Sequence, residues 1–161
     1  MTEVTTSSLA RHPFLRAMAP GHLDILAEAG AEVSFPAGHR IFEQGEFAGR
    51  FWLIESGHVA LDVCVPGEGR AVVDNVGMGE LLGVSWVFPP YRWAFGGVCV
   101  GPVRAFEFDA VAVRARCTAD PLFYSDLSGR LLAVFALRLQ STRARLIARP
   151  VAGGGAIVAD A

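Results

Sequence analysis

The sequence predicts a mainly β fold with flanking helices, an antiparallel sandwich or roll that is followed by one long C-terminal helix. Turn-forming residues, chiefly Gly and Pro, recur at short intervals through residues 36–102. The runs between them are rich in Val, Ile and Phe, and several alternate apolar and polar residues, as the strands of antiparallel sandwiches and rolls do. Residues 120–149, in contrast, contain no helix breaker except Gly129, which predicts a long helix.

The N-terminal part predicts short helices over about residues 9–30. Apolar residues recur there at helical spacing, and the stretch APGH at residues 19–22 interrupts them. From residue 31 the pattern changes to short strands separated by turns, and we assign residues 31–119 to the β-roll. Together with the C-terminal helix, these parts are expected to form a single domain over residues 1–149.

The C-terminal helix is predicted over residues 120–149. Asp120 followed by Pro121 is a favourable helix start. Five residues of this segment follow one another at alternating spacings of three and four, which is typical of a seam that packs against a partner helix. They are Leu132, Phe135, Leu139, Thr142 and Leu146. We therefore expect a homodimer through this helix, followed by a disordered Gly-rich tail over residues 150–161.

The composition fits one domain that is not a general nucleic-acid binder. The chain has 161 residues, of which 52% are hydrophobic, and this is enough for a sizeable core. Its 14 basic residues are all arginine, and with 16 acidic residues the formal net charge is −2. Nucleic-acid binding needs clustered positive charge. No apolar run is long enough to span a membrane, and residues 1–14 lack the pattern of a signal peptide, so we expect a cytoplasmic protein.

One stretch of the roll, GMGELLGVSWVFPPYRWAFG at residues 77–96, has the features of an anion site. Its glycines permit tight turns and a close approach of a ligand to the backbone. A single helical turn within residues 80–88 would leave its first amides without internal partners. Arg92 can add a bidentate guanidinium, which suits a phosphate or a carboxylate ligand. The alternative is that Arg92 pairs with an internal carboxylate.

The order of motifs resembles the cyclic nucleotide-binding domain family, of the kind found in the catabolite activator protein. The matching pieces are FPAGHRIFEQGE (35–46), FWLIESGHVALDV (51–63), VGMGELLG (76–83), RWAF (92–95) and RLQST (138–142). This resemblance implies a double-stranded β-helix, or jelly roll, with a sensory or regulatory function and no enzymatic activity. In the family, the segment like GELLG…RWA is the phosphate-binding cassette, and its arginine holds the cyclic phosphate. The implied ligand-binding residues are Gly79, Glu80, Leu81, Leu82, Gly83, Val84, Ser85, Arg92, Trp93, Ala94 and, through a hydroxyl offered to the purine, Thr142.

Three positions depart from the family pattern. Val84 stands where the family usually has a glutamate that binds the ribose 2′-hydroxyl, and Ser85 and Trp86 follow where small or leucine-like residues are usual. Trp93 replaces the usual Ser or Ala after the arginine, whereas Ala94 keeps the next small residue. Losing a charged acceptor costs about 1.5–3 kcal/mol, or about ten- to a hundredfold in affinity. We therefore expect weak or changed binding of a cyclic nucleotide, cAMP or cGMP, or of another small anion.

Two other functions are compatible with the sequence. The first is a non-ligand-binding scaffold or protein-interaction module, which predicts that Arg92 is buried against a protein carboxylate and that Trp86 or Trp93 fills the cavity. The second is a relative of the Crp/Fnr-type transcription regulators that lacks their helix-turn-helix. The 12 residues after residue 149 are too few to form such a DNA-binding module.

Metal and catalytic sites are not indicated. His39, Glu43 and His58 resemble the first motif of the cupins, but the second histidine of its HxH pair and the whole second motif are missing. The three cysteines form no CxxC, so neither a zinc site nor a disulfide framework is predicted. Ser85 has no evident basic partner, and no Gly-x-Ser-x-Gly elbow is present. We expect no metal and no resident cofactor.

Overall fold

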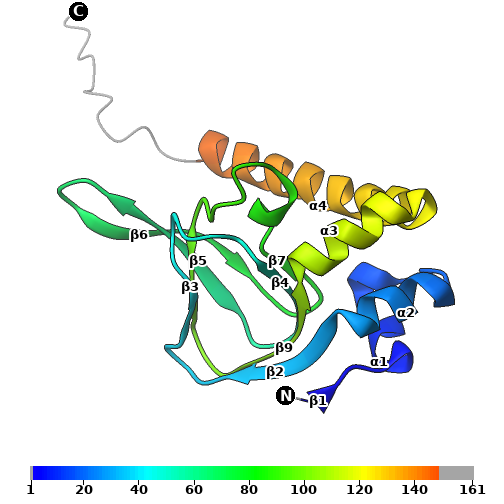
Figure 1. Cartoon of the computed structure of the whole chain (residues 1–161). Helices are drawn as coiled ribbons and strands as arrows, with labels where there is room; N and C mark the ends of the chain where they lie inside the picture. Colours follow the sequence, from blue (N-terminus) through cyan, green and yellow to red (C-terminus); the bar gives the residue numbers. More distant parts are fainter. Residues whose placement is uncertain (1, 149–161) are drawn as a thin grey trace, which may run out of the picture. The chain divides into compact units, whose positions relative to one another are not determined.

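Two antiparallel sheets form the roll in the computed structural model, which describes residues 2–148. The first sheet has the strand order β1-β2-β9-β4-β7 and the second has the order β3-β8-β5-β6 (Figure 1). The strands of the first sheet are β1 (Thr2–Glu3), β2 (Gly30–Phe35), β4 (Arg50–Ser56), β7 (Leu81–Leu82) and β9 (Val103–Asp109). Those of the second are β3 (Arg40–Phe42), β5 (Val59–Val65), β6 (Gly69–Val76) and β8 (Gly96–Cys99). The predicted mainly β architecture with flanking helices is confirmed.

Three of the helices, those that begin at Thr6, Ala110 and Pro121, are capped by side chains that accept hydrogen bonds from their first amides. Thr5 and Ser8 form a capping box at the start of the first helix, and the Asp109 carboxylate accepts a hydrogen bond from the amide of Ala112. Asp120 accepts hydrogen bonds from the amides of Leu122 and Phe123, so the predicted Asp-Pro start holds. The α-helices are α1 (Thr6–Ala10), α2 (Pro20–Glu28), α3 (Ala110–Ala119) and α4 (Pro121–Ala148). Two 3-10 helices are η1 (Pro13–Leu15) and η2 (Ser85–Val87).

Residues 110–119 form helix α3. The sequence analysis had assigned them to the β-roll, and this assignment was wrong. The strands end at Asp109, whose side chain caps α3, and the buried residues Ala110 and Val113 lie one helical turn apart. The alanine and valine residues of this segment are compatible with either a strand or a helix. The helix is favoured by the cap at Asp109 and by packing against β4 and β9. At the other end, Thr2 and Glu3 add a short strand to the sheet before the first helix.

The chain divides into two compact units, Met1–Leu127 and Ser128–Ala161. The first contains both sheets, the helices α1 to α3 and the first turns of α4. His22 of α2 contacts Asp126 of these turns at 3.0 Å, and the buried Phe123 ring lies edge-on to the His22 ring. The second unit contains the rest of α4, described as far as Ala148. The predicted tail, residues 150–161, lies outside the described residues.

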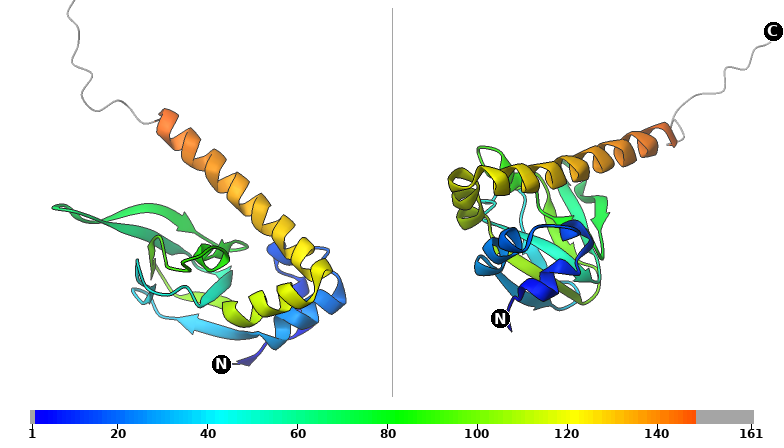
Figure 2. Two further views of the ribbon diagram at one scale, coloured as in Figure 1. Left: turned by 45° about the horizontal axis from the view of Figure 1, so that its top comes forward. Right: turned by 90° about the vertical axis from the view of Figure 1, so that its right-hand side faces the viewer.

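The first sheet presents a different set of side chains on each face. Phe51 and Leu53 of β4 alternate with Trp52 and Ile54, so the two pairs point to opposite faces. On one face Phe51 stacks on Phe108, among buried side chains of the helices. Figure 2 shows α2 and α3 side by side at this part of the first unit. Trp52, on the other face, stacks on Phe42 of the second sheet, so this face lines the inside of the roll.

Among residues 2–148, none of the helices has both the length and the apolar character needed to cross a membrane.

Candidate functional site

The first half of the predicted cassette continues the first sheet. Leu81 and Leu82 form β7, whose register pairs them with Leu53 and Trp52 of β4, and both leucines are fully buried. Gly79 has a φ of 83°, and its amide donates to the carbonyl oxygen of Ile54 at 2.9 Å. The helical turn expected within residues 80–88 is limited to the 3-10 helix η2, because the two leucines are held in the sheet.

Short polar contacts fix the loop around η2. The Glu80 carboxylate accepts a hydrogen bond from the amide of Gly77 at 2.5 Å. The Ser85 hydroxyl accepts one from the amide of Ala94 at 3.2 Å, so the two ends of the cassette lie side by side. Val84 precedes η2 with a φ of −127° and offers no side-chain acceptor to a ligand hydroxyl.

Arg92 is exposed and hydrogen-bonded to the main chain. Its Nη1 donates to the carbonyl oxygen of Gly45 at 3.0 Å, and its backbone forms an isolated β-bridge with Phe47. The observed partner is a neutral carbonyl and not the internal carboxylate of the alternative hypothesis, whereas the binding of an anion by Arg92 stays a prediction. A guanidinium has five N–H donors, so Arg92 retains donors for a further ligand.

Trp93 lies inside the roll, beside the glycine that follows β7. The side chain is only 5% exposed, and its ring stacks on Phe42 at 4.2 Å and on Trp52 at 5.9 Å between centroids. Its amide donates to the carbonyl of Glu46, which anchors the residue to the β3–β4 loop. Gly83 has a φ of 91°, and a Cβ there would lie 2.8 Å from Cη2 of Trp93. The large indole therefore fits only because residue 83 has no side chain.

Thr142, the eleventh predicted site residue, lies in the second unit. Its hydroxyl donates to the carbonyl oxygen of Arg138 at 2.8 Å, a bond within helix α4. The other ten predicted residues lie in the first unit, on β7, on η2 or in the loops beside them.

Sequence reasoning missed Arg114, which connects helix α3 to the cassette. Its Nη1 donates to the carbonyl oxygen of Trp86 at 2.8 Å, and the guanidinium carbon lies 4.0 Å from the centre of the Tyr91 ring. This geometry combines a charge-assisted hydrogen bond with a cation–π contact. Nothing in the local sequence marks Arg114, because both partners are more than 20 residues away along the chain.

A buried ion pair was also missed. Asp62 of β5 is 4% exposed and receives two hydrogen bonds from Arg40 of β3, at 3.1 and 2.7 Å. Arg70 lies 3.7 Å from the same carboxylate, and Glu43 contacts both arginines. The hydrogen bonds from Arg40 hold the pKa of Asp62 below its ordinary value, against the opposing effect of burial. Glu43, which matched the cupin motif, is therefore held in an ion-pair network.

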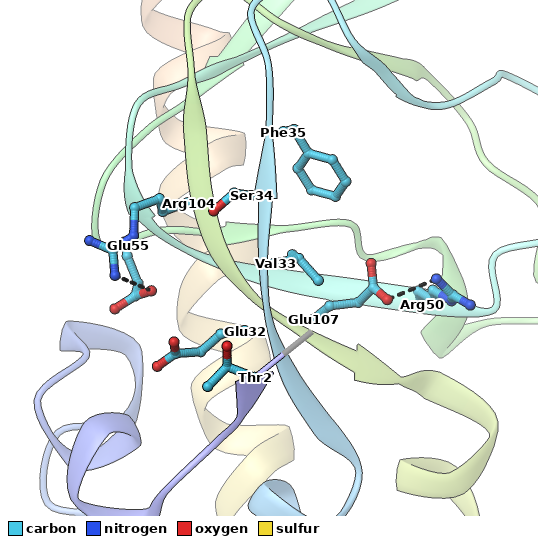
Figure 3. A pocket seen from close by; sticks show the side chains of 9 residues that line it. All are labelled: Thr2, Glu32, Val33, Ser34, Phe35, Arg50, Glu55, Arg104 and Glu107. Carbon is cyan, nitrogen blue, oxygen red and sulfur yellow. Dashed lines mark hydrogen bonds and ion pairs between the residues drawn. The ribbon is translucent and has the colours of Figure 1, made fainter.

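Among the cavities lined by residues 2–148, three open on the first sheet and its surroundings. One of about 520 Å³ lies along β2 and is bordered by the ion pairs Arg50–Glu107 and Arg104–Glu55 (Figure 3). A second, of about 460 Å³, lies between β3, β4 and the β3–β4 loop and has Trp52 and Trp93 in its wall. The third, of about 420 Å³, lies beside His12 and Gly79. Within residues 2–148 no group of three or more His, Cys, Asp or Glu side chains has metal-binding geometry.

The chain is similar to known regulators and to solved domains of the same fold. It is 28% identical over 138 residues to the CRP-like cAMP-activated global transcriptional regulator of Mycobacterium tuberculosis. That match covers 86% of this chain but only 60% of the regulator, so the chain spans about three fifths of its curated relative.

Two solved structures share the fold at low sequence identity. A cyclic nucleotide-binding domain from Methylobacillus flagellatus KT has a TM-score of 0.78 and 14% identity, over 93% of this chain and 86% of that domain. The catabolite activator protein of Thermus thermophilus has a TM-score of 0.66 and 23% identity, over 84% of this chain and 62% of that protein. The model of the cyclic nucleotide-binding domain family matches residues 32–120, which is more than half of the chain. The jelly roll predicted from the motifs is thus confirmed, and the chain belongs to the cyclic nucleotide-binding domain family, related to the CRP-like regulators.

Proposed function

We propose that this chain is a dimeric sensory or regulatory domain whose altered cassette binds cyclic nucleotides weakly. The observation that carries the proposal is the position of Trp93, which lies inside the roll against Gly83 and in a cluster of stacked rings with Phe42 and Trp52. If the cassette of this chain acts as the resemblance implies, the indole occupies space beside the glycine that a ligand would have to approach.

Val84 is a second feature that should weaken the binding of a cyclic nucleotide. With Val84 in place of a glutamate, a ribose hydroxyl would lose a charged acceptor, which costs about 1.5–3 kcal/mol. A hydroxyl placed against the valine methyl groups would also lose its hydration without compensation. A micromolar site would thereby weaken to a dissociation constant between about tens of micromolar and millimolar.

Arg92 favours a remaining affinity for small anions. It is exposed, and its one described hydrogen bond goes to a carbonyl oxygen, so binding a phosphate would not require breaking an ion pair. This position also counts against the scaffold hypothesis, which expects Arg92 to be buried against a carboxylate. The filled interior at Trp93 agrees with that hypothesis, and it therefore stays as the second candidate.

The dimer is proposed through helix α4. Leu132, Leu139 and Leu146 of the predicted seam are 67%, 53% and 63% exposed. Three large apolar side chains in one helical row leave a substantial apolar surface to be buried by a partner helix. Phe135 of the same row is half-buried.

The test is a gain of function. Isothermal titration with cAMP and cGMP should give a dissociation constant between about tens of micromolar and millimolar for the wild type. The double variant Trp93→Ser with Val84→Glu, which empties the interior and restores the acceptor, should bind cAMP at least about tenfold more tightly. Val72→Glu, the same change at an exposed residue of β6, is the control and should leave binding unaltered. Micromolar binding by the wild type, or no gain in a folded double variant, would refute the proposal.

A further inference from the structure

Arginines flank the apolar seam of helix α4 on both of its sides. In a heptad repeat that begins at Leu132, the three leucines of the seam take position a, and Phe135 and Thr142 take position d. Positions e and g lie beside such a seam. Between Phe135 and Leu146 these positions hold Ala136, Arg138, Arg143 and Arg145. Every charged residue that flanks this stretch of the seam is therefore an arginine.

The described part of the second unit is basic as a whole. Ser128–Ala148 contains four arginines and no acidic residue, which gives a formal charge of +4. Arg143 and Arg145 are exposed, and so are the three leucines of the seam, at 67%, 53% and 63%. A long arginine side chain can lie along apolar surface while its guanidinium reaches a partner. A helix that covers the seam would therefore meet guanidinium groups along both edges.

Two copies of this helix would bring like charges together. In a parallel pair, position g faces the next position e of the other helix, so Arg138 would face Arg143 of the second copy. In an antiparallel pair, g faces g and e faces e, and each charged pair again consists of two arginines. Juxtaposed like charges oppose association and select against the wrong partner. The seam can bury its leucines in a homodimer, but its flanks weaken that complex.

We propose that the seam binds an amphipathic helix of another protein whose flanking positions are acidic. The apolar residues of that helix would cover the leucines, and its carboxylates would pair with Arg138, Arg143 and Arg145. Thr142 does not oppose this contact, because its hydroxyl already donates to the carbonyl oxygen of Arg138 at 2.8 Å and its methyl group can join the seam. Charge complementarity thus selects the acidic helix over a second copy of this chain.

The apolar seam also distinguishes a protein helix from a nucleic acid. A nucleic acid would pair with the arginines but would leave the leucines uncovered, whereas a helix satisfies both. The inference goes beyond the proposed function, which names only a second copy as the partner of α4. It does not depend on the homodimer, because a monomer would offer the same seam to an acidic helix.

The probe is a synthetic helical peptide of about four heptads with leucine at positions a and d and glutamate at e and g. Fluorescence anisotropy of the labelled peptide against the full chain should give a dissociation constant of about tens of micromolar or tighter. The matched peptide with lysine at e and g should bind at least about tenfold more weakly. Raising the NaCl concentration from about 50 to about 500 mM should weaken the binding of the glutamate peptide.

Two further probes separate a helix site from attraction by charge alone. A scrambled glutamate peptide has the same composition without the heptad pattern and should bind at least about tenfold more weakly than the patterned one. A short DNA duplex should also bind more weakly, because it cannot cover the leucines. Equal binding of the patterned peptide and any one of the other three probes would overturn the proposal, as would no binding of the patterned peptide up to about 200 μM.

A double variant tests the flanking charges. Arg143→Gln with Arg145→Gln leaves the seam intact and should weaken binding of the glutamate peptide about three- to tenfold, while binding of the lysine peptide becomes tighter. Arg11→Gln with Arg116→Gln removes the same charge from exposed residues outside α4 and is the control, which should bind as the wild type does. A folded Arg143/Arg145 variant with unchanged affinity for both peptides would contradict the assignment.

Sedimentation of the wild type without peptide tests the homodimer separately. A monomer that binds the glutamate peptide would remove the dimer from the proposed function and keep the acidic partner. A homodimer that does not bind the glutamate peptide would overturn the inference and leave the proposed function unchanged.

Discussion

The indole of Trp93 and the backbone of Gly83 touch so closely that residue 83 has no room for a Cβ, which would lie 2.8 Å from Cη2 of the ring. The two residues come from opposite ends of the cassette, and their contact closes the inside of the roll beside it. The glycine that marks the family's cassette thus serves here to accommodate a large side chain of the same protein.

Gly83→Ala should destabilise the fold by about 1–3 kcal/mol. The new methyl group would meet the Trp93 ring, and a φ of 91° is strained for any residue with a Cβ. The free energy of unfolding is measured by denaturant titration. Gly21→Ala is the control, because it has open space in helix α2 and should be neutral or slightly stabilising. Equal stability of the two variants would show that Gly83 is not constrained.

Arg114→Ala should loosen the cassette loop. The change removes the hydrogen bond to Trp86 and the contact with Tyr91, and we expect the free energy of unfolding to fall by about 1–2 kcal/mol. Hydrogen exchange at residues 86–92 should become faster. Arg116→Ala, on the same helix, removes an exposed ion pair with Glu28 and should cost at most about 1 kcal/mol. Unchanged exchange in the Arg114 variant would exclude a coupling between α3 and the cassette.

Asp62→Asn should lower stability by about 1–3 kcal/mol at neutral pH, since Arg40 would lose the more buried of its two charged partners, Asp62 and Glu43. The pKa of Asp62 is depressed in the folded state, so its contribution is present above the unfolded value of 3.8 and is lost as pH falls through the folded value. The variant should therefore approach the wild type in stability as pH is lowered below about 4. The double variant Arg40→Met with Asp62→Leu should recover much of the loss. A constant difference at all pH values would refute this account.

Acidification should also destabilise the protein through His12. Its Nδ1 accepts a hydrogen bond from the amide of Phe14 and its Nε2 donates to the carbonyl of Ile54, which requires the neutral ring. Burial lowers the pKa of His12 below 6.5, although the bond to Ile54 opposes this shift. The unfolded state therefore takes up the proton first, and stability falls as pH drops below about 6.5. His12→Gln should have a smaller change in unfolding free energy between pH 7.5 and 5. An identical slope in both proteins would exclude His12 as the cause.

Leu139→Asp should shift the proposed dimer toward monomer, because it places a charge in the apolar row of α4. Sedimentation velocity at about 20–50 μM measures the change. Leu137→Asp is the matched control, since Leu137 is 65% exposed on the same helix but outside the row. A wild-type monomer in this concentration range would remove the dimer from the proposed function.

Much of the architecture follows from local patterns in the sequence. The cap at Asp120 and Pro121 starts α4 where predicted, and turns at glycines such as Gly45 and Gly57, both with positive φ, separate the strands. These features depend on the conformations and hydrogen bonds of residues close together in the chain. The order of such motifs was sufficient to identify the jelly roll, and the place of the cassette within it stays a prediction.

The content of the site was decided by tertiary contacts. Arg40 and Asp62 meet because β3 and β5 both pair with β8, and Arg114 reaches Trp86 from a separate helix. The sequence by itself established that Trp93 departs from the family pattern, but only the folded roll determined that its indole points inward against Gly83. The physical reason is that strand register and sheet packing, which join residues distant in the chain, decide which side chains share an interior.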